Sequence, residues 1–434
     1  MTEQFLRVYG NRSEFVHEDG TWETFSEGAQ SPAAAQRAAL VTSRLREGYL
    51  ETLINGIMDG TIPFDATSVP DELKTNFQQL VNSVTSEVGR ALIGLTFLQL
   101  TIKTICPEQS IRLHKGGKNA SGFSWAEGIS MRTIDKSYIT PVLRRYNLLS
   151  LNADGIMMTR SLAENYPYSS LYKAQVRGAK EQWLAIVEFL ETHSFNTEEA
   201  LKLLIKLLLD RAAIFEGLAN ETIDTLNQKM DRFVSRKCVM DLLTQHRDLT
   251  DYAARLLEIG MHSLCQAAVE SGAISLCLNP LSQMRSANKK HGNVGDIEFL
   301  DGRVIVESWD AKYGKNYLRE ELEELNEKLI QHPDVCIAGF VTSDPPMLSS
   351  EIHKRIAELE EFHNVSVRIV SFREWIDYIF DRCIQTNTIS EEILAQQWLR
   401  SYTMSLAQKK RDIAPIDEPC MSWLQLLKDL LTAI

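Results

Sequence analysis

The spacing of apolar residues divides the chain into a largely helical first part and a second part in which helices alternate with strands. In "SPAAAQRAALVTSRLREGYLETLINGIMDG" and "NTEEALKLLIKLLLDRAAIFEGLA", apolar residues recur every three or four positions, which is the period of an amphipathic helix. Similar stretches continue to about residue 250. We therefore expect the first part to be mostly α-helical, with a mixed segment at its start.

The second part carries the pattern of an α/β domain. A helix over 250–272 leads to two β-rich segments, "VGDIEFL" and "RVIVESWDAK", and the Asp-Gly dipeptide between them is favoured in hairpin turns. The elements that follow are a charged helix over 317–332, a strand over 335–344, a helix over 349–363, a strand over 365–372 and a helix over 373–383. This order predicts a mixed sheet with helices covering both of its faces.

A helix followed by a hairpin is expected between residues 135 and 160. "DKSYITPVLRRYNLL" has the pattern of a short amphipathic helix, and in "LSLNADGIMMTR" an Asn-Ala-Asp-Gly turn separates two short apolar runs. This order is typical of a winged helix, whose recognition helix binds the DNA major groove. The alternatives are an ordinary helix and hairpin within a larger domain, or a winged helix that serves as a protein interaction module. The candidate DNA contacts are Lys136, Ser137, Tyr138, Arg144, Arg145 and Arg160.

These patterns divide the chain into five segments. They are a mixed and helical region over 1–100, a predicted winged-helix DNA-recognition region over 101–180, a helical connector over 181–249, the α/β domain over 250–385 and a helical tail over 386–434. The tail contains an amphipathic helix that could form a dimer contact.

The charge of the chain is uneven. Its net charge of −12 argues against a protein that coats nucleic acid without selectivity. Residues 101–180, however, hold twelve lysines and arginines against five acidic residues. Such a basic segment in an acidic chain predicts a local phosphate-binding surface, and a solvated helix face is the alternative.

Several functional classes are unsupported by the sequence. No apolar run approaches the roughly 20 residues that a membrane span needs, and the first residues lack the apolar core of a secretory signal. The seven cysteines are scattered without a CxxC pair, which predicts a reducing, cytoplasmic location without disulfides or structural zinc. Glycine-rich nucleotide-binding motifs are absent from the sequence, so no nucleotide cofactor is expected.

Charged residues meet at the open end of the predicted hairpin. Residues two apart in a strand share a face, so Asp310 and Lys312 point to one side, and pairing through the turn brings Asp296 beside them. Two close carboxylates repel each other unless a cation lies between them, and Mg²⁺ takes one or two such ligands. We therefore expect Asp296 and Asp310 to bind Mg²⁺, and Lys312 to orient the attacking water and offset charge on a phosphate ester.

The "GD" at 295–296 and the "DAK" fourteen positions further on resemble the motif of the PD-(D/E)XK nuclease superfamily, and the order of flanking elements is similar too. The resemblance covers about residues 250–380 and is closest to a Type II restriction endonuclease. It implies that Asp296 and Asp310 are metal ligands and that Lys312 is the catalytic lysine. Gly295 stands where the motif has proline, a variation that we treat as harmless.

The resemblance also raises candidates for further ligands. An acidic residue on the preceding helix sometimes adds one in this superfamily, and Glu258 and Glu270 are the candidates here. Glu298 and Glu307 lie close enough in sequence to compete, although Glu307 falls on the opposite face unless a bulge intervenes. Basic residues around the motif, Lys289, Lys290 and Lys315, could contact the DNA backbone.

The sequence thus favours a restriction enzyme that makes Mg²⁺-dependent double-strand cuts at a specific DNA sequence, as a homodimer because one such site cuts one strand. A repair or modification-dependent nuclease of the same superfamily shares the chemistry and stays open. So does a non-catalytic winged-helix DNA-binding protein, in which the hairpin is only a salt-bridged part of an inert domain.

Overall fold

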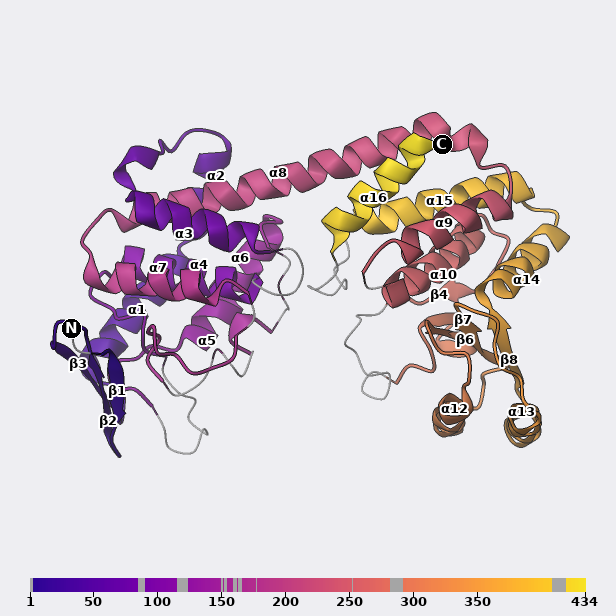
Figure 1. Cartoon of the computed structure of the whole chain (residues 1–434), viewed down its shortest axis with the longest axis horizontal. Helices are drawn as coiled ribbons and strands as arrows, with labels where there is room; N and C mark the ends of the chain where they lie inside the picture. Colours follow the sequence, from indigo (N-terminus) through magenta and orange to yellow (C-terminus); the bar gives the residue numbers. More distant parts are fainter. Residues whose placement is uncertain are drawn as a thin grey trace. The chain divides into compact units, whose positions relative to one another are not determined.

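The chain folds into two compact units, Met1–Ile214 and Phe215–Ile434, which are described one at a time. The structure is a computed structural model (Figure 1). It describes residues 3–84, 90–114, 124–149, 151, 154–158, 162, 166–176, 178–251, 253–281, 292–407 and 419–434.

The first unit begins with a small antiparallel sheet. Its strands are β1 (Phe5–Val8), β2 (Arg12–Val16) and β3 (Trp22–Ser26), in the order β1-β2-β3. Phe15 and Phe25 point from one face of this sheet into a small apolar cluster. The alternation of buried and exposed residues along β2 and β3 follows from the two-residue period of a strand.

Helices make up most of the rest of the first unit. They are α1 (Pro32–Arg46), α2 (Tyr49–Met58), α3 (Asp71–Asn82), α4 (Arg90–Ile105), α5 (Met131–Ile134), α6 (Thr140–Arg145), α7 (Lys180–Thr192) and the first part of α8 (Thr197–Lys229). Every residue of α4 from Leu92 to Lys103 is buried, and α3 and α7 pack against it and against each other (Figure 1). A helix that is buried on all sides lies at the centre of such a bundle, and apolar residues predominate along it.

The helix that we predicted from residue 135 is present, but the hairpin expected after it is wrong. A π-helical turn over Asp135–Ile139 joins α5 to α6. The apolar run expected as the second strand of the wing, Ile156–Met158, forms a 3₁₀ helix instead. Among the residues that the structure describes between 146 and 162, none belongs to a strand.

A buried carboxylate explains this difference. The Asp135 side chain accepts hydrogen bonds from the backbone N–H groups of Ile156 at 2.6 Å and Met157 at 3.1 Å, and from the Thr140 hydroxyl at 2.7 Å. Gly155, at φ +91°, lies so close that a Cβ atom there would be 2.5 Å from an Asp135 carboxylate oxygen. Satisfying a buried acid in this way holds 155–157 in a helical turn, because the N–H groups point inward and not across a strand pair.

The second unit contains the mixed sheet that the sequence predicted. Its strands are β4 (Cys277–Leu278), β5 (Ile297–Asp301), β6 (Val304–Lys312), β7 (Ile337–Thr342) and β8 (Ser366–Ser371). They follow in sequence order across the sheet, with β4, β5 and β6 antiparallel and β6, β7 and β8 parallel. The β5–β6 hairpin turns at Gly302, whose φ of +61° suits a residue without a Cβ atom.

Helices cover both faces of this sheet, as expected (Figure 1). On one side lie α12 (Arg319–Gln331) and α13 (Ser350–His363). The other side is covered by α10 (Ala253–Glu270) and α14 (Phe372–Gln385), and further out pack α9 (Arg236–Asp248), α15 (Glu391–Ala407) and α16 (Cys420–Ala433).

The helical tail belongs to the core of the second unit. Trp398, Leu399 and Tyr402 of α15 are buried, and the Trp398 indole N–H donates to the carbonyl of Gly260 in α10 at 2.9 Å. This apolar face is therefore buried within the chain, and the dimer contact suggested for the tail stays a prediction. Within the described residues, none of the helices is long and apolar enough to cross a bilayer.

Candidate functional site

The register of the hairpin brings Asp296, Asp310 and Lys312 together. Ile297 pairs with Trp309, so Asp296 comes to lie beside Asp310. The register shifts only further along, between Phe299 and Leu300, and leaves this end regular. Asp310 and Lys312 point to the α12 side of the sheet, because the intervening and preceding residues of β6 point to the α10 side.

Hydrogen bonds hold the three groups in place. The backbone N–H of Ala311 donates to Asp296 Oδ2 at 3.0 Å, and Lys312 Nζ lies 2.9 Å from Asp310 Oδ2. The two carboxyl groups lie close enough for each to shift the pKa of the other. The side chains of Asp310 and Lys312 are only 10% and 18% exposed, so solvent screens these interactions weakly.

The pKa values of Asp296 and Asp310 are shifted in opposite directions. Burial, the Asp310 charge and the Glu258 charge raise the pKa of Asp296 well above its usual value. For Asp310, burial acts in the same direction, but the hydrogen bond with Asp296 and the charges of Lys312 and Lys328 outweigh it and lower the pKa. The two buried acids therefore titrate as a coupled pair, in which Asp296 keeps its proton to a higher pH than Asp310.

The Lys312 ammonium is stabilised in its charged form. Burial acts to lower its pKa, but the carboxylates of Asp310 and Asp296 and the charge of Glu321 outweigh burial and raise it. A protonated lysine can donate to a phosphoryl oxygen or orient a water molecule, but it is a weak proton acceptor. The geometry therefore favours electrostatic help from Lys312 over a role as general base.

The other acidic candidates do not join the pair equally. Glu298 accepts from the N–H groups of Val294 and Gly295 at 2.6 and 3.4 Å and from Asn279 Nδ2 at 2.7 Å. Both carboxylate oxygens of Glu298 therefore already accept hydrogen bonds, one from the backbone just before Asp296 and the other from Asn279. This geometry does not support the ligand role suggested for Glu298.

Glu307 and Glu270 lie away from the Asp296–Asp310 pair, whereas Glu258 lies near it. Glu307 faces the α10 side, where it pairs with Arg382 at 2.6 Å, so it is not brought to the acid pair. Glu270 is exposed at the end of α10 and accepts from Gln266 at 2.8 Å. Glu258, paired with Arg255 in α10, is close enough for its charge to raise the pKa of Asp296. Of the two α10 candidates, the structure therefore places Glu258 by the site.

The backbone before Asp296 approaches β6 very closely. A Cβ atom on Gly295 would lie 2.6 Å from Ser308 Oγ and 2.7 Å from the Trp309 carbonyl oxygen. A proline carries the same Cβ atom and would meet the same neighbours. Gly295 is therefore demanded by packing in this chain, which the motif comparison did not predict.

Lys328 is a further charged residue at the site, and sequence reasoning missed it. This α12 residue donates to the Val294 carbonyl at 2.9 Å, and its Nζ lies 4.0 Å from Asp310 Oδ2. The only available signal was a lysine beside the apolar stripe of Leu322, Leu325 and Leu329, and that pattern does not tell which end of the sheet the lysine reaches.

The donor set suits one hard cation with few protein ligands. In the part of the chain that the structure describes, His, Cys, Asp and Glu form no group of three in an arrangement that could hold a metal ion. Mg²⁺ needs only one or two carboxylates and keeps several waters. Asp296 and Asp310 fit that requirement, since the hairpin register places them side by side and a cation between them would offset the repulsion of two close carboxylates.

The predicted DNA contacts on the α5–α6 helix are partly exposed. Lys136 and Arg145 reach solvent and form ion pairs at 3.4 Å with Asp154 and Glu51. The other candidates are Ser137, which is exposed, Arg144, which is half-buried, and Tyr138, which packs against the core. Arg160, Lys289 and Lys290 lie outside the described residues. Lys315 is paired with Glu321 at 2.5 Å.

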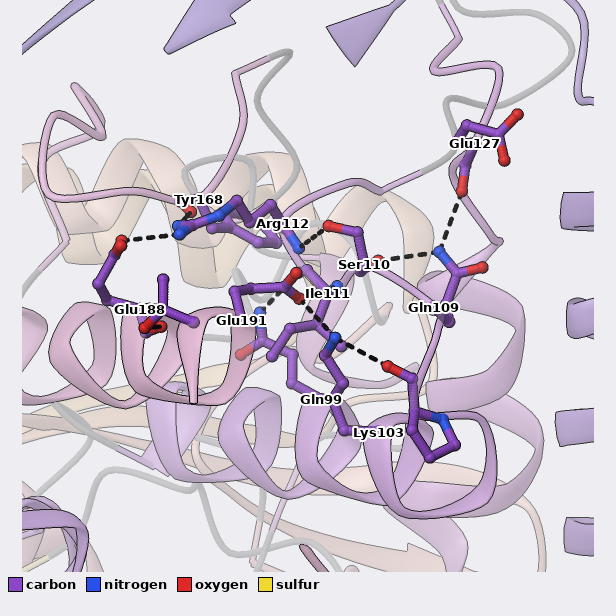
Figure 2. Close-up of polar contacts among 12 residues, drawn as sticks. Gln99, Lys103, Gln109, Ser110, Ile111, Arg112, Glu127, Tyr168, Glu188 and Glu191 are labelled. Atoms are coloured by element: carbon purple, nitrogen blue, oxygen red, sulfur yellow. Dashed lines mark hydrogen bonds and ion pairs between the residues drawn. The ribbon is translucent and has the colours of Figure 1, made fainter. Parts of the chain in front are cut away.

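Two of the basic residues counted in 101–180 are buried in ion pairs (Figure 2). Arg112 is fully buried and lies 2.8 Å from Glu188 of α7. Lys103 donates to the Pro107 carbonyl at 3.1 Å and pairs with Glu191 of α7 at 3.3 Å. These charges are neutralised inside the first unit, so the charge count overstates the basic surface that DNA could contact.

Comparison with protein-family models and with curated protein sequences found no match to this chain. The geometry at the end of the hairpin is therefore the basis for a functional assignment.

Proposed function

We propose that the second unit is a Mg²⁺-dependent endonuclease domain that hydrolyses phosphodiester bonds in DNA, as Type II restriction endonucleases do. The observation that carries this proposal is the convergence of Asp296, Asp310 and Lys312 at one end of a hairpin in a mixed sheet. A buried acid pair beside a charged lysine suits a polyanionic ester better than a neutral substrate, because it can position both a cation and a phosphate.

Each residue has a distinct part in this proposal. Asp296 and Asp310 would hold Mg²⁺, which when bound lowers the pKa of a coordinated water and offsets charge on the phosphate. The Ala311 N–H fixes one oxygen of Asp296, so this carboxylate is oriented before the cation binds. Lys312 would turn from Asp310 toward a phosphoryl oxygen of the DNA.

The proposed partner is double-stranded DNA, and the proposed assembly is a homodimer. The exposed side of the α5–α6 helix, with Lys136, Ser137 and Arg145, would contact the DNA backbone. Two copies would place two sites on the opposite strands of one target, as a two-fold axis requires.

The test is an incubation of the purified protein with unmethylated phage DNA, with Mg²⁺ or with EDTA, beside Lys312→Ala. Discrete fragments formed only with Mg²⁺ and lost in the variant would support a sequence-specific nuclease. Cleavage of methylated DNA alone would favour a modification-dependent nuclease. DNA binding without cleavage of either substrate would refute the hydrolytic proposal and leave the binding-only alternative.

A further inference from the structure

Helix α12 presents a charged edge to the candidate site. Its apolar stripe of Leu322, Leu325 and Leu329 packs on the sheet. Glu321 and Lys328, seven positions apart, lie on the same side of the helix next to this stripe because seven residues complete two turns. The charges of both residues act on groups of the hairpin, Glu321 on Lys312 and Lys328 on Asp310.

Lys328 is unusually buried for a lysine. Its side chain is 11% exposed, and lysines are rarely buried unless they are paired. Here the ammonium has two partners that belong to different parts of the site: the Val294 carbonyl at 2.9 Å and Asp310 Oδ2 at 4.0 Å. One side chain of α12 thus connects the turn that precedes β5 with the acid on β6.

The turn at Val294 is held by side chains from two directions. The Val294 N–H donates to Glu298 Oε1 at 2.6 Å, while its carbonyl accepts from Lys328. Neither group takes part in the strand pairing that begins at Ile297. The position of Asp296, two residues after Val294, therefore depends on these two contacts and on the Ala311 N–H.

The two lysines at Asp310 differ in their freedom. Lys312 Nζ is closer to Asp310 Oδ2, at 2.9 Å, and otherwise lies over the face of the Phe340 ring. Lys328, by contrast, also donates to a backbone carbonyl, which holds it in place. If Lys312 turns toward a phosphate, Lys328 still offsets the Asp310 charge, because the two charged groups are 4.0 Å apart and both are largely buried, so solvent screens their attraction weakly.

We propose that Lys328 is a positioning residue of this site, which holds the Val294–Asp296 turn on α12 and stays beside Asp310 when Lys312 engages the substrate. The role in catalysis rests on the proposed nuclease function, whereas the role in holding the turn can be measured without it.

The experiment compares Lys328→Met, which removes the charge and the donor at similar length, with Lys328→Arg, which keeps both. Lys354→Met, an exposed lysine of α13, is the matched control. Circular dichroism and thermal unfolding confirm that each variant folds. Cleavage kinetics give kcat and KM for DNA, and hydrogen exchange with mass spectrometry follows a peptide covering 292–299 beside one covering Ile337–Thr342.

For Lys328→Met, we expect kcat to fall by on the order of tenfold to a hundredfold with KM for DNA nearly unchanged, since a loss of positioning costs rate and not binding. Exchange in 292–299 should rise by about fivefold or more, and exchange in β7 should stay as in the wild type. Lys328→Arg should recover most of both effects, and Lys354→Met should show neither.

The remaining outcomes separate this inference from the proposed function. A rise in KM with unchanged kcat would mean that Lys328 contacts DNA, and unchanged exchange in 292–299 would mean that it does not hold the turn; either overturns the inference. A wild-type protein that cuts no DNA overturns the nuclease proposal, and the exchange measurement then still decides whether Lys328 holds the turn.

Discussion

Replacing Gly295 with alanine tests whether the close approach of the backbone before β5 to β6 determines the position of Asp296. The added Cβ atom would lie 2.6 Å from Ser308 Oγ, 2.7 Å from the Trp309 carbonyl oxygen and 2.9 Å from the Trp309 carbonyl carbon. Two of these atoms belong to the backbone of a central strand and cannot rotate away. Overpacking of this kind costs about 1–3 kcal/mol, and relief requires the backbone before Asp296 to move away from β6.

Urea unfolding at pH 7 measures the cost for the second unit, and cleavage assays measure the consequence for the site. The free energy of unfolding of Gly295→Ala should be about 1–3 kcal/mol lower than that of the wild type, so the variant should unfold at a lower urea concentration. It should also cut DNA far more slowly. Gly217→Ala is the matched control, since Gly217 lies within α8 and an added Cβ there would meet no atom within 4 Å other than the helix's own backbone. This control should gain up to about 1 kcal/mol from helix propensity. Wild-type stability in Gly295→Ala would refute the argument from close packing.

Two further predictions concern buried titratable groups of the second unit. Asp296→Asn should abolish Mg²⁺-dependent cleavage yet raise stability at pH 7 by about 1–2 kcal/mol, because it removes the repulsion and burial cost that raise the Asp296 pKa; an unchanged or lower urea midpoint would contradict this. His246 lies 2.8 Å from both the Tyr402 hydroxyl and the Trp423 carbonyl, and burial lowers its pKa to about 4. The unfolded chain, with a His pKa of about 6.5, binds the proton more readily, so stability should fall by about 2 kcal/mol between pH 7 and pH 5. Urea unfolding of His246→Gln should show a correspondingly smaller fall, and equal pH dependence in both proteins would count against a neutral buried His246.

The hairpin and its three charged residues could be predicted because the necessary information is local. The two-residue period of a strand and an Asp-Gly turn fix which residues meet, and Asp296, Asp310 and Lys312 follow from that. The contribution of Lys328 depends on the depth at which α12 docks on the sheet, and that is decided by the packing of its leucines. No window of the sequence around Lys328 contains this information.

The hairpin predicted after residue 149 was wrong for the opposite reason: a residue outside the segment, Asp135, determines its conformation. The Asn-Ala-Asp-Gly turn and the apolar residues after it satisfy the rules for a hairpin. In the folded protein, the buried Asp135 carboxylate takes the N–H groups of Ile156 and Met157. A buried acid without hydrogen-bond partners would cost more free energy than one strand pairing gains. Asp135 lies outside residues 149–160, so the pattern of that segment alone does not reveal its effect.

The place of α16 in the second unit has a consequence for the synthesis of the protein. Trp423, Leu424, Leu427 and Leu431 of this helix are buried in the same apolar core as α10 and α15. A nascent chain interrupted before residue 419 already contains Asp296, Asp310, Lys312 and Lys328, but it leaves the surface that α16 covers open to water. Translation must therefore pass α16 before this core closes, and prematurely terminated chains should be substrates for chaperones and proteases and not for assembly of the site.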